Sequence, residues 1–310
     1  MRNLPQPVVN RAMANGVAGR DWLNQLDSLI ADLESLWHIS VGDALSGGTA
    51  ACVAPADGKR GRRCVLRIDM PGDSSFDNAV HALELADGRG YVRLIASDAQ
   101  RHACLLERLG APLRVLNAPV DQQLDILCDS LNHAWLPISD ASLPGCAESI
   151  AWFRDFIPKV WQTLNRPCPR SIIDRALEFL DERAAYDRPA EHVLVHGDAN
   201  SANLLQVPGQ PGEFRFIDPD GLCYEKAYDL GVLMREWVDE YRSAPVRAGQ
   251  ERCAHLHRRT GVDPRAIWQW GYLQSVSTGL VCMQIHYDDH TGDLLLQLAD
   301  AWRAVQPPHL

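Results

Sequence analysis

Residues 196–203 read His-Gly-Asp-Ala-Asn-Ser-Ala-Asn, and residues 216–220 read Phe-Ile-Asp-Pro-Asp. Between these stretches, two β-prone runs flank a Pro-Gly-Gln-Pro-Gly turn, a pattern that predicts a hairpin. Such a hairpin would return the chain so that Asp218 lies beside Asp198 and Asn203. Two carboxylates and an amide around one point are the groups that a magnesium–nucleotide site for phosphoryl transfer requires.

The spacing of these residues narrows the chemistry. In kinase catalytic loops an Asp accepts the proton of the acceptor hydroxyl, and an Asn five positions later binds magnesium. Asp198 and Asn203 have this spacing, and Asp218, which follows a strand, would be the second metal ligand. Because Asp and Asn are also common in turns, a chance match in a solvated loop is the competing explanation. The order of the three elements favours the kinase-like interpretation.

Composition limits the class of protein. The chain has 310 residues, 46% of them hydrophobic and 23% charged, which is ordinary for a globular protein with room for two lobes. No apolar run approaches the ~18 residues of a membrane helix. The N-terminus lacks the apolar core of a signal peptide, so we expect a cytoplasmic protein with no membrane partner. The nine cysteines are scattered, which disfavours a disulfide framework or a zinc ribbon.

The charge of the chain bears on its partners. A formal net charge of −10 argues against nucleic acid, because phosphate backbones require clustered Lys and Arg. An acidic surface suits a cationic substrate, although solubility alone also explains it. The charge is therefore compatible with a cationic small-molecule substrate, to which the phosphoryl-transfer motifs add a hydroxyl group, and we expect a monomer or weak dimer as the assembly.

The N-terminal third reads as helix and strand around a glycine loop. Apolar residues over 21–37 have helical spacing. The next motif, Ser46-Gly47-Gly48-Thr49, could cover a nucleotide, since glycine permits close approach to phosphates, but an ordinary hairpin turn explains it equally well. Residues 64–68 then form a predicted strand, in which Arg67 occupies the place where kinase-like proteins carry a phosphate-binding Lys.

An Arg at position 67, where kinase-like proteins carry a Lys, is not a conservative replacement, because the guanidinium group is larger and binds phosphate through a planar fork. It leaves three possibilities open: a working variant, a displaced cation, or a catalytically weakened protein. The alternative without a functional role is that Arg67 is an exposed residue on an edge strand. The predicted helix over 77–86 would supply an acid to pair with this cation, and we favour Asp77 over Glu84. Two further strands are expected at 91–95 and 103–106, with a turn at 97–100 between them.

From residue 111 the chain becomes helical. Apolar periodicity predicts helices over 120–135, 147–164 and 170–186, before the catalytic loop. After the hairpin, two more apolar helices are expected at the C-terminal end. Their spans are 264–287 and 292–305, with five residues assigned to the core: Trp268, Trp270, Leu273, Val276 and Leu280.

The catalytic motifs resemble the aminoglycoside phosphotransferase family. Within it, Ile-Asp-Pro-x-Gly-Leu at 217–222 and Ala-Tyr-Asp at 227–229 resemble the branch of streptomycin 6-phosphotransferases and hydroxyurea phosphotransferases. Further similarities extend over nearly the whole chain, including Gly-Val-Asp-Pro-Arg at 261–265. Asp220 departs from the pattern, where Lys or an apolar residue is usual, and this could alter the pocket next to the metal.

The resemblance implies a fold and an activity. The fold would be a bilobal, protein-kinase-like α+β fold with a β-rich small lobe at 1–110 and a mainly helical large lobe at 111–310. The activity would be transfer of the γ-phosphoryl group of ATP, with Mg²⁺, to a hydroxyl of an aminoglycoside-type molecule, with streptomycin the leading candidate and antibiotic resistance as the outcome. A kinase for another hydroxylated metabolite and a nucleotide-binding pseudoenzyme are the alternatives.

The resemblance also implies roles for particular residues. Asp198 would deprotonate the acceptor hydroxyl, His196 would support the loop, and Asn203 and Asp218 would bind magnesium. The segment 106–110 resembles the hinge, where the backbone around Glu107 and Leu109 would bind adenine. Asp229 would fix the catalytic loop, although a helix-start acid is an equal alternative. Glu225, Glu236, Asp239 and Glu240 are candidate contacts to a cationic substrate, although a solvated helix face is the favoured explanation for them. Asp220 is a further candidate contact to the substrate.

Two histidine clusters resemble metal sites only superficially. Cys-Ala-His-Leu-His at 253–257 alternates along a predicted helix, so its side chains would diverge. His-Tyr-Asp-Asp-His at 286–290 lacks the Glu of His-Glu-x-x-His. We interpret both as surface residues at helix ends.

Overall fold

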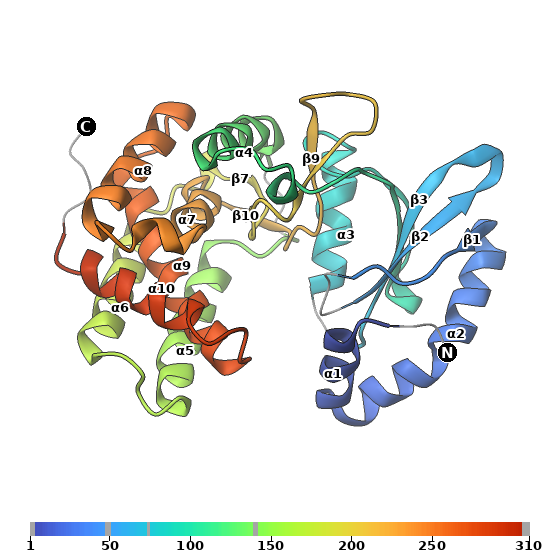
Figure 1. The fold of residues 1–310 in the computed structure, drawn as a ribbon, viewed down its shortest axis with the longest axis horizontal. Coiled ribbons are helices and arrows are strands. Elements are labelled where there is room, and N and C mark those ends of the chain that lie inside the picture. The colour runs from blue at the N-terminus through green and yellow to red at the C-terminus, as the bar shows by residue number, and fades with distance from the viewer. Residues whose placement is uncertain (1–3, 47–50, 73–74, 139–141, 306–310) are drawn as a thin grey trace. The chain divides into compact units, whose positions relative to one another are not determined.

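The computed structural model describes residues 4–46, 51–72, 75–138 and 142–305. Contacts between residues divide the chain into two compact units (Figure 1). The first unit contains residues 1–110 and 206–217, and the second contains 111–205 and 218–310. Among the described residues, no helix combines the length and the apolarity needed to cross a membrane.

The first unit is built on an antiparallel five-stranded sheet with the strand order β1-β2-β3-β5-β4. Its helices are α1 (Gln6–Ala14), α2 (Gly16–Trp37) and α3 (Ser75–Ala86). Its strands are β1 (Ile39–Val41), β2 (Ala51–Gly58), β3 (Arg63–Asp69), β4 (Leu94–Asp98), β5 (Ala103–Glu107) and β9 (Phe214–Phe216). The helices predicted at 21–37 and 77–86 and the strand predicted at 64–68 are confirmed, each with a slightly longer span.

Helix α2 covers one face of this sheet (Figure 1). Alternate residues of β3 point to opposite faces, and Cys64, Leu66 and Ile68 are buried against the apolar stripe of α2. That stripe consists of Trp22, Leu26, Ile30 and Leu33. The alternation places Arg67 and Asp69 on the opposite face of the sheet.

The strand predicted at 91–95 is displaced in the structure. Tyr91 forms an isolated parallel bridge with Phe216, and β4 begins only at Leu94. The reason is a competing partner, because the Val92 N–H donates to the Phe216 carbonyl at 2.8 Å and the Phe216 N–H to the Gly90 carbonyl at 2.9 Å. The turn predicted at 97–100 begins later, because β4 continues its pairing with β5 to Asp98 before a short 3-10 helix at Ala99–Arg101.

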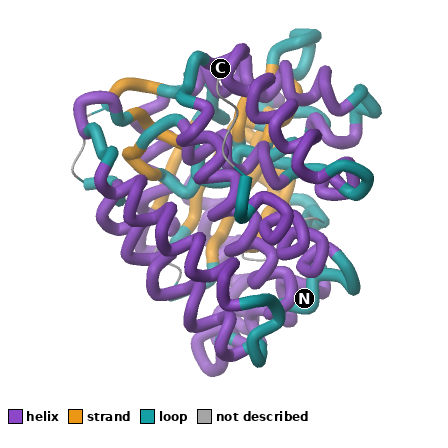
Figure 2. The backbone as a smooth tube through the Cα atoms, turned by 90° about the vertical axis from the view of Figure 1, so that its left-hand side faces the viewer, coloured by secondary structure: helices purple, strands orange, loops and turns teal. Residues whose placement is uncertain are grey.

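The second unit is mainly helical, as Figure 2 shows from the side of this unit. Its helices are α4 (Val120–Ala134), α5 (Cys146–Thr163), α6 (Arg170–Ala185), α7 (Ala227–Arg235), α8 (Pro245–Thr260), α9 (Pro264–Gln284) and α10 (Thr291–Trp302). Its strands are β6 (Leu136–Pro137), β7 (Val193–Val195), β8 (Leu204–Gln206) and β10 (Leu222–Tyr224), with β10, β7 and β6 adjacent in one sheet. The predicted helices are confirmed, with ends shifted by one to three residues.

Helix α9 is the centre of the second unit. It packs against α5, α6, α7, α8 and α10, and almost every residue from Ala266 to Leu280 is buried. A helix that is buried all round lacks a polar face, which agrees with its apolar sequence. The five residues assigned to the core are confirmed, each with no exposed surface.

The hairpin predicted from the sequence is confirmed, because β8 and β9 form a two-stranded sheet. Its returning strand contacts the first unit, where Arg215 Nη1 donates to Glu107 Oε1 at 2.5 Å. These contacts explain why residues 206–217 belong to the first unit. The predicted division of the chain into two lobes at residue 110 therefore leaves residues 206–217 out of the first unit. The composition of the chain around these residues does not indicate to which unit they belong.

Candidate active site

The catalytic loop follows β7 and is held by the return of the chain through β10. Val195 pairs with Leu222, and the Asp220 N–H donates to the His196 carbonyl at 2.8 Å. Gly197 has a φ of +94°, and a Cβ there would lie only 2.6 Å from the Cβ of Asp220. Glycine is therefore required at this crossing. Since consecutive Cα atoms are ~3.8 Å apart, Asp218 cannot lie more than about 8 Å along the chain from Asp220.

Asp198 is half-buried and bound through both carboxylate oxygens. Arg235 Nη2 donates to Oδ1 at 2.7 Å, and Asn200 Nδ2 donates to Oδ2 at 2.9 Å. Partial burial raises the pKa of this carboxyl, but Arg235 and the other donors outweigh burial, so the net pKa is lowered. The group is therefore ionised at neutral pH and can accept a proton.

Asn203 is oriented by hydrogen bonds to Asp198. Its Nδ2 donates to the Asp198 carbonyl at 3.0 Å and lies 3.4 Å from Asp198 Oδ2. The loop is further closed by Asn200, whose Oδ1 accepts from the Asn203 N–H at 3.2 Å. Among the residues that the structure describes, none donates to Asn203 Oδ1, so this oxygen is available to a cation.

A buried platform of His196 and Asp229 lies beneath the loop. Asp229 accepts from the Gly197 N–H at 2.8 Å, from the His196 N–H at 2.9 Å and from Trp135 Nε1 at 2.9 Å. His196 Nδ1 accepts from the Asp198 N–H at 3.1 Å, which places the ring proton on Nε2. Burial raises the pKa of the Asp229 carboxyl, and the His196 ring and the three N–H donors counteract part of that rise.

Replacing Asp229 with Asn is expected to destabilise the fold by about 3 kcal/mol. An Asn amide presents one oxygen and one NH₂ group to three N–H donors, so at least one buried donor loses its partner. Urea unfolding monitored by tryptophan fluorescence measures the change. Asp174→Asn on α6 is the matched control, because Asp174 is half-exposed in its pair with Arg170 and should change stability little. Equal stability of the two variants would contradict the role of Asp229.

Asp218 has the chemistry of a magnesium ligand. It is exposed, belongs to the second unit like Asn203, and has a φ of +59°, a left-handed conformation that Asp tolerates better than most residues. Among the described residues, no group of three or more His, Cys, Asp or Glu side chains could bind a metal. One carboxylate and one amide oxygen nevertheless fit Mg²⁺, which in kinases takes few protein ligands and completes its shell with phosphates and water.

Two consecutive residues at the end of α7, not recognised as loop-binding from the sequence, bind the loop at two different residues. Arg235 binds Asp198, and Glu236 Oε1 accepts from both the N–H and the hydroxyl of Ser201. Glu236 is the residue that the sequence suggested as a contact to a cationic substrate, and in the structure its carboxylate is bound to Ser201. Burial raises the pKa of Glu236, while Ser201 opposes the rise.

Replacing Arg235 with Gln is expected to shift the acid limb of the pH profile of kcat upward. Asp198 has a lowered pKa, so it is active as a base above that pKa and activity is lost as the pH falls through it. Without the guanidinium the pKa of Asp198 rises, because the largest pKa-lowering charge next to it is removed, and the loss of activity begins at higher pH. Arg242→Gln, which removes an exposed cation paired with Asp239, should leave the profile unchanged. Superimposable profiles for both variants would contradict the effect of Arg235 on the base.

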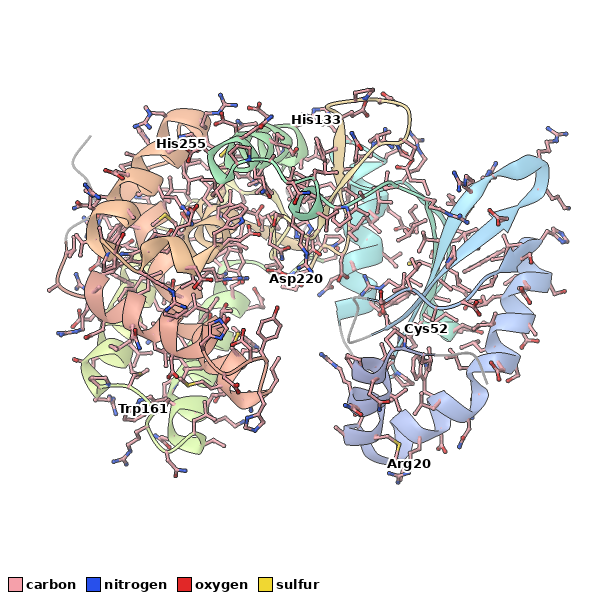
Figure 3. The ribbon with its side chains drawn as sticks, viewed as in Figure 1. Arg20, Cys52, His133, Trp161, Asp220 and His255 are labelled. Atoms are coloured by element: carbon pink, nitrogen blue, oxygen red, sulfur yellow. The ribbon has the colours of Figure 1, made fainter. Side chains whose placement is uncertain are left out.

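The other acids proposed for the substrate differ in their surroundings. Glu225 Oε1 accepts from Trp270 Nε1 at 2.8 Å and lies 3.2 Å from Arg183 Nε, so it belongs to a largely buried ion pair. The alternative explanation for Glu225, a solvated helix face, does not hold for this largely buried carboxylate, and its contact with a substrate stays a prediction. Asp239 is exposed and pairs with Arg242 at 2.7 Å. Asp220 lies beside Gly197 and is exposed (Figure 3).

The histidine clusters have local partners. His255 on α8 (Figure 3) lies 3.0 Å from Asp125 Oδ1, and His257 Nδ1 lies 2.8 Å from the Val262 carbonyl. His290 lies 3.8 Å from Asp288. His257 lies in the last turn of α8 and His290 directly precedes α10, as predicted for helix ends, but Cys253 is fully buried inside α8, so the prediction of a surface residue is wrong there.

In the first unit, the proposed phosphate-binding cation has an acid on its own strand. Arg67 Nε donates to Asp69 Oδ1 at 2.8 Å, and Asp69 is buried. Within the described residues no ion pair joins Arg67 to Asp77, which is exposed on α3. The sequence missed Asp69, although residues two apart on a strand share a face. Of the glycine loop, Ser46 is exposed, and Gly47, Gly48 and Thr49 lie outside the described residues.

The segment proposed as the hinge follows β5. The Glu107 carboxylate accepts from the Arg93 N–H at 2.8 Å and from Arg215 at 2.5 Å, so its side chain is engaged in the first unit. Leu109 differs, because its backbone N–H and C=O form no hydrogen bond with another residue in the described part of the chain. A free donor and acceptor next to each other are what an adenine edge can bind.

Comparisons with known proteins agree with this arrangement. A family model described as "Aminoglycoside/hydroxyurea antibiotic resistance kinase" matches residues 36–307. Streptomycin 6-kinase of Streptomyces glaucescens is 25% identical over 281 residues, which are 89% of this chain and 90% of that protein.

Solved structures show the same fold. Choline kinase LicA of Streptococcus pneumoniae superposes with a TM-score of 0.63 at 17% identity, over 90% of this chain and 99% of that chain. An aminoglycoside phosphotransferase of Streptomyces rimosus, in complex with ADP and streptomycin, gives a TM-score of 0.57 at 16% identity, over 82% and 98%. The fold predicted from the sequence, a protein-kinase-like fold with a sheet-rich and a mainly helical part, is thereby confirmed.

Proposed function

The chain belongs to the aminoglycoside/hydroxyurea antibiotic resistance kinase family, and from this premise we propose that it transfers the γ-phosphoryl group of ATP to a hydroxyl of streptomycin or a similar aminoglycoside. Membership of this family makes the chain an enzyme, a small-molecule kinase with an alcohol group as acceptor. The identity of the alcohol and of the nucleotide is the proposal.

The geometry of Asp198 supports this function more than any other observation. Its carboxylate is ionised, is held by Arg235 and Asn200, and lies on the loop that carries Oδ1 of the Asn203 side chain. An acceptor hydroxyl that donates to Asp198 would be oriented for attack on the phosphoryl group, and Asp198 would take its proton.

Asn203 and Asp218 would hold the magnesium ion of the nucleotide. Magnesium supplies charge neutralisation for the phosphate oxygens in the transition state. In the first unit, Arg67 would bind phosphate oxygens while Asp69 fixes its orientation, and the Leu109 backbone would bind adenine. These assignments rest on the contacts described above and on the chemistry of each group.

A cationic acceptor fits the acids near the loop. Asp220 is exposed next to Gly197, and the chain carries a net charge of −10. We assign substrate recognition to Asp220 before the other acids, because it is exposed and adjoins Gly197 of the catalytic loop. The relatives named for streptomycin support an aminoglycoside as the cation.

ATP consumption measured against a panel of aminoglycosides and other hydroxylated compounds, with mass spectrometry of each product, tests the proposal. We expect streptomycin to gain one phosphoryl group, and the Asp198→Asn variant to serve as the blank. If streptomycin remains unmodified while an unrelated alcohol is phosphorylated, the substrate is wrong and the chemistry stands. If ATP binds and no compound in the panel turns over, the pseudoenzyme alternative is favoured.

A further inference from the structure

A second cavity lies in the first unit, on the face of the sheet that α2 covers. It has a volume of about 410 Å³ and is formed by the end of α2, the β2–β3 turn, and strands β1, β3, β4 and β5. Its floor is apolar and contains six side chains: Trp37, Ile39, Cys64, Ile95, Ala96 and Leu105. Burial raises the pKa of the Cys64 thiol, so the thiol is neutral and belongs to this apolar floor.

The rim of the cavity is cationic. Lys59, Arg60 and Arg62 line it, and within the described residues none of the three forms an ion pair. The acid of the turn, Asp57, does not neutralise them, because it pairs with Arg108 at 3.0 Å. Three uncompensated cations around one opening are unexpected in a chain with a net charge of −10.

The turn holds these cations in place. The Gly58 N–H donates to the Arg62 carbonyl at 2.8 Å, which closes the turn between β2 and β3. Arg108 braces the hairpin by donating to the carbonyls of Cys64 and Ala56 at 3.0 and 2.8 Å. The backbone that carries the three cations is therefore fixed by hydrogen bonds, while their side chains are exposed to solvent at the opening.

The electrostatic balance at the opening favours an anion. The C-terminal end of α2 also reaches the cavity through Trp37 and His38, and its partial charge of about −0.5 opposes anion binding. The three positive charges of Lys59, Arg60 and Arg62 outweigh this partial negative charge of the helix end. Among the described residues, no carboxylate lines the cavity.

We propose that this cavity binds a small organic anion with an apolar, ring-sized body. Its volume falls within the range of about 300–1,000 Å³ typical of small-molecule sites, which combine an apolar lining with a few polar groups. The site is separate from the candidate active site, because Cys64 faces the cavity while Arg67 lies on the opposite face of the same strand.

Isothermal titration with 2-naphthalenesulfonate tests the proposal. We expect one site per chain, with affinity lowered about tenfold in the Lys59→Ala/Arg62→Ala double variant. Arg63→Ala is the matched control, since Arg63 directly follows the turn as the first residue of β3 but does not line the cavity, and its effect should be much smaller. Ala96→Trp, which fills the floor, should abolish binding while the thermal unfolding transition is retained.

Three outcomes would overturn the proposal. Equal losses for Arg63→Ala and for the double variant would mean that diffuse charge attracts the probe. Equal binding of the neutral 2-naphthalenemethanol would mean that the cations do not contribute. Unchanged binding in a folded Ala96→Trp variant would place the probe outside the cavity.

Discussion

Replacing Asp198 with Asn is expected to lower kcat by about 10²–10⁴ while nucleotide affinity is retained. The substitution keeps the shape of the side chain and removes its ability to accept a proton. Asp198 is the residue whose carboxylate Arg235 and Asn200 hold ionised, so the loss should fall on the chemical step. Single-turnover phosphorylation of the acceptor, together with titration of the nucleotide, measures the two effects separately.

The variant needs a stability control because Arg235 loses its charged partner. Arg235 is mostly buried, with 18% of its side chain exposed, so an unpaired guanidinium could loosen the loop. Urea unfolding of Asp198→Asn therefore accompanies the kinetics. A folded variant with kcat within a few-fold of the parent would show that Asp198 is not the base.

Replacing Asp218 with Ala is expected to lower turnover by about 10³ or more, because a metal ion contributes several kcal/mol to the transition state and each ~1.4 kcal/mol is a factor of ten. Asp218 is exposed and held in a left-handed conformation beside the loop, so its loss should affect metal binding more than folding. Electron paramagnetic resonance of Mn²⁺ in the presence of the nucleotide measures the affinity for the metal.

Asp239→Ala is the matched control for this experiment. Asp239 is also an exposed acid in the second unit, but it pairs with Arg242 and is not proposed as a metal ligand. Its variant should bind Mn²⁺ like the parent. Equal Mn²⁺ affinity in Asp218→Ala and in the parent would remove Asp218 from the metal site.

The parts of the molecule that the sequence predicts well are those determined locally. The functional residues of the loop 196–203 are close together in the sequence and therefore form a recognisable motif. Helices α2 and α9 are predicted by their long runs of regularly spaced apolar residues. The hairpin β8–β9 follows from the Pro/Gly turn between two β-prone runs.

The parts that it does not predict depend on distant partners. The sequence around Glu225 is that of a solvent-exposed acid, because its two partners lie far away in the chain. These partners are Arg183 on α6 and Trp270 on α9. Arg235 and Glu236 reach the catalytic loop only because α7 ends beside it, and no local pattern indicates where a helix end will lie. Tyr91 does not belong to the strand predicted at 91–95, because it forms a β-bridge with Phe216, which is distant in the sequence.

A crystal structure of the protein with Mg²⁺, a non-hydrolysable ATP analogue and streptomycin tests the central claim most directly. The account predicts a magnesium ion bound at about 2.1 Å by Asn203 Oδ1 and an Asp218 carboxylate oxygen. It also predicts a streptomycin hydroxyl within about 3 Å of the Asp198 carboxylate. A metal ion bound to the nucleotide without contact to Asn203 or Asp218, or an Asp198 carboxylate turned away from every acceptor hydroxyl, would contradict it.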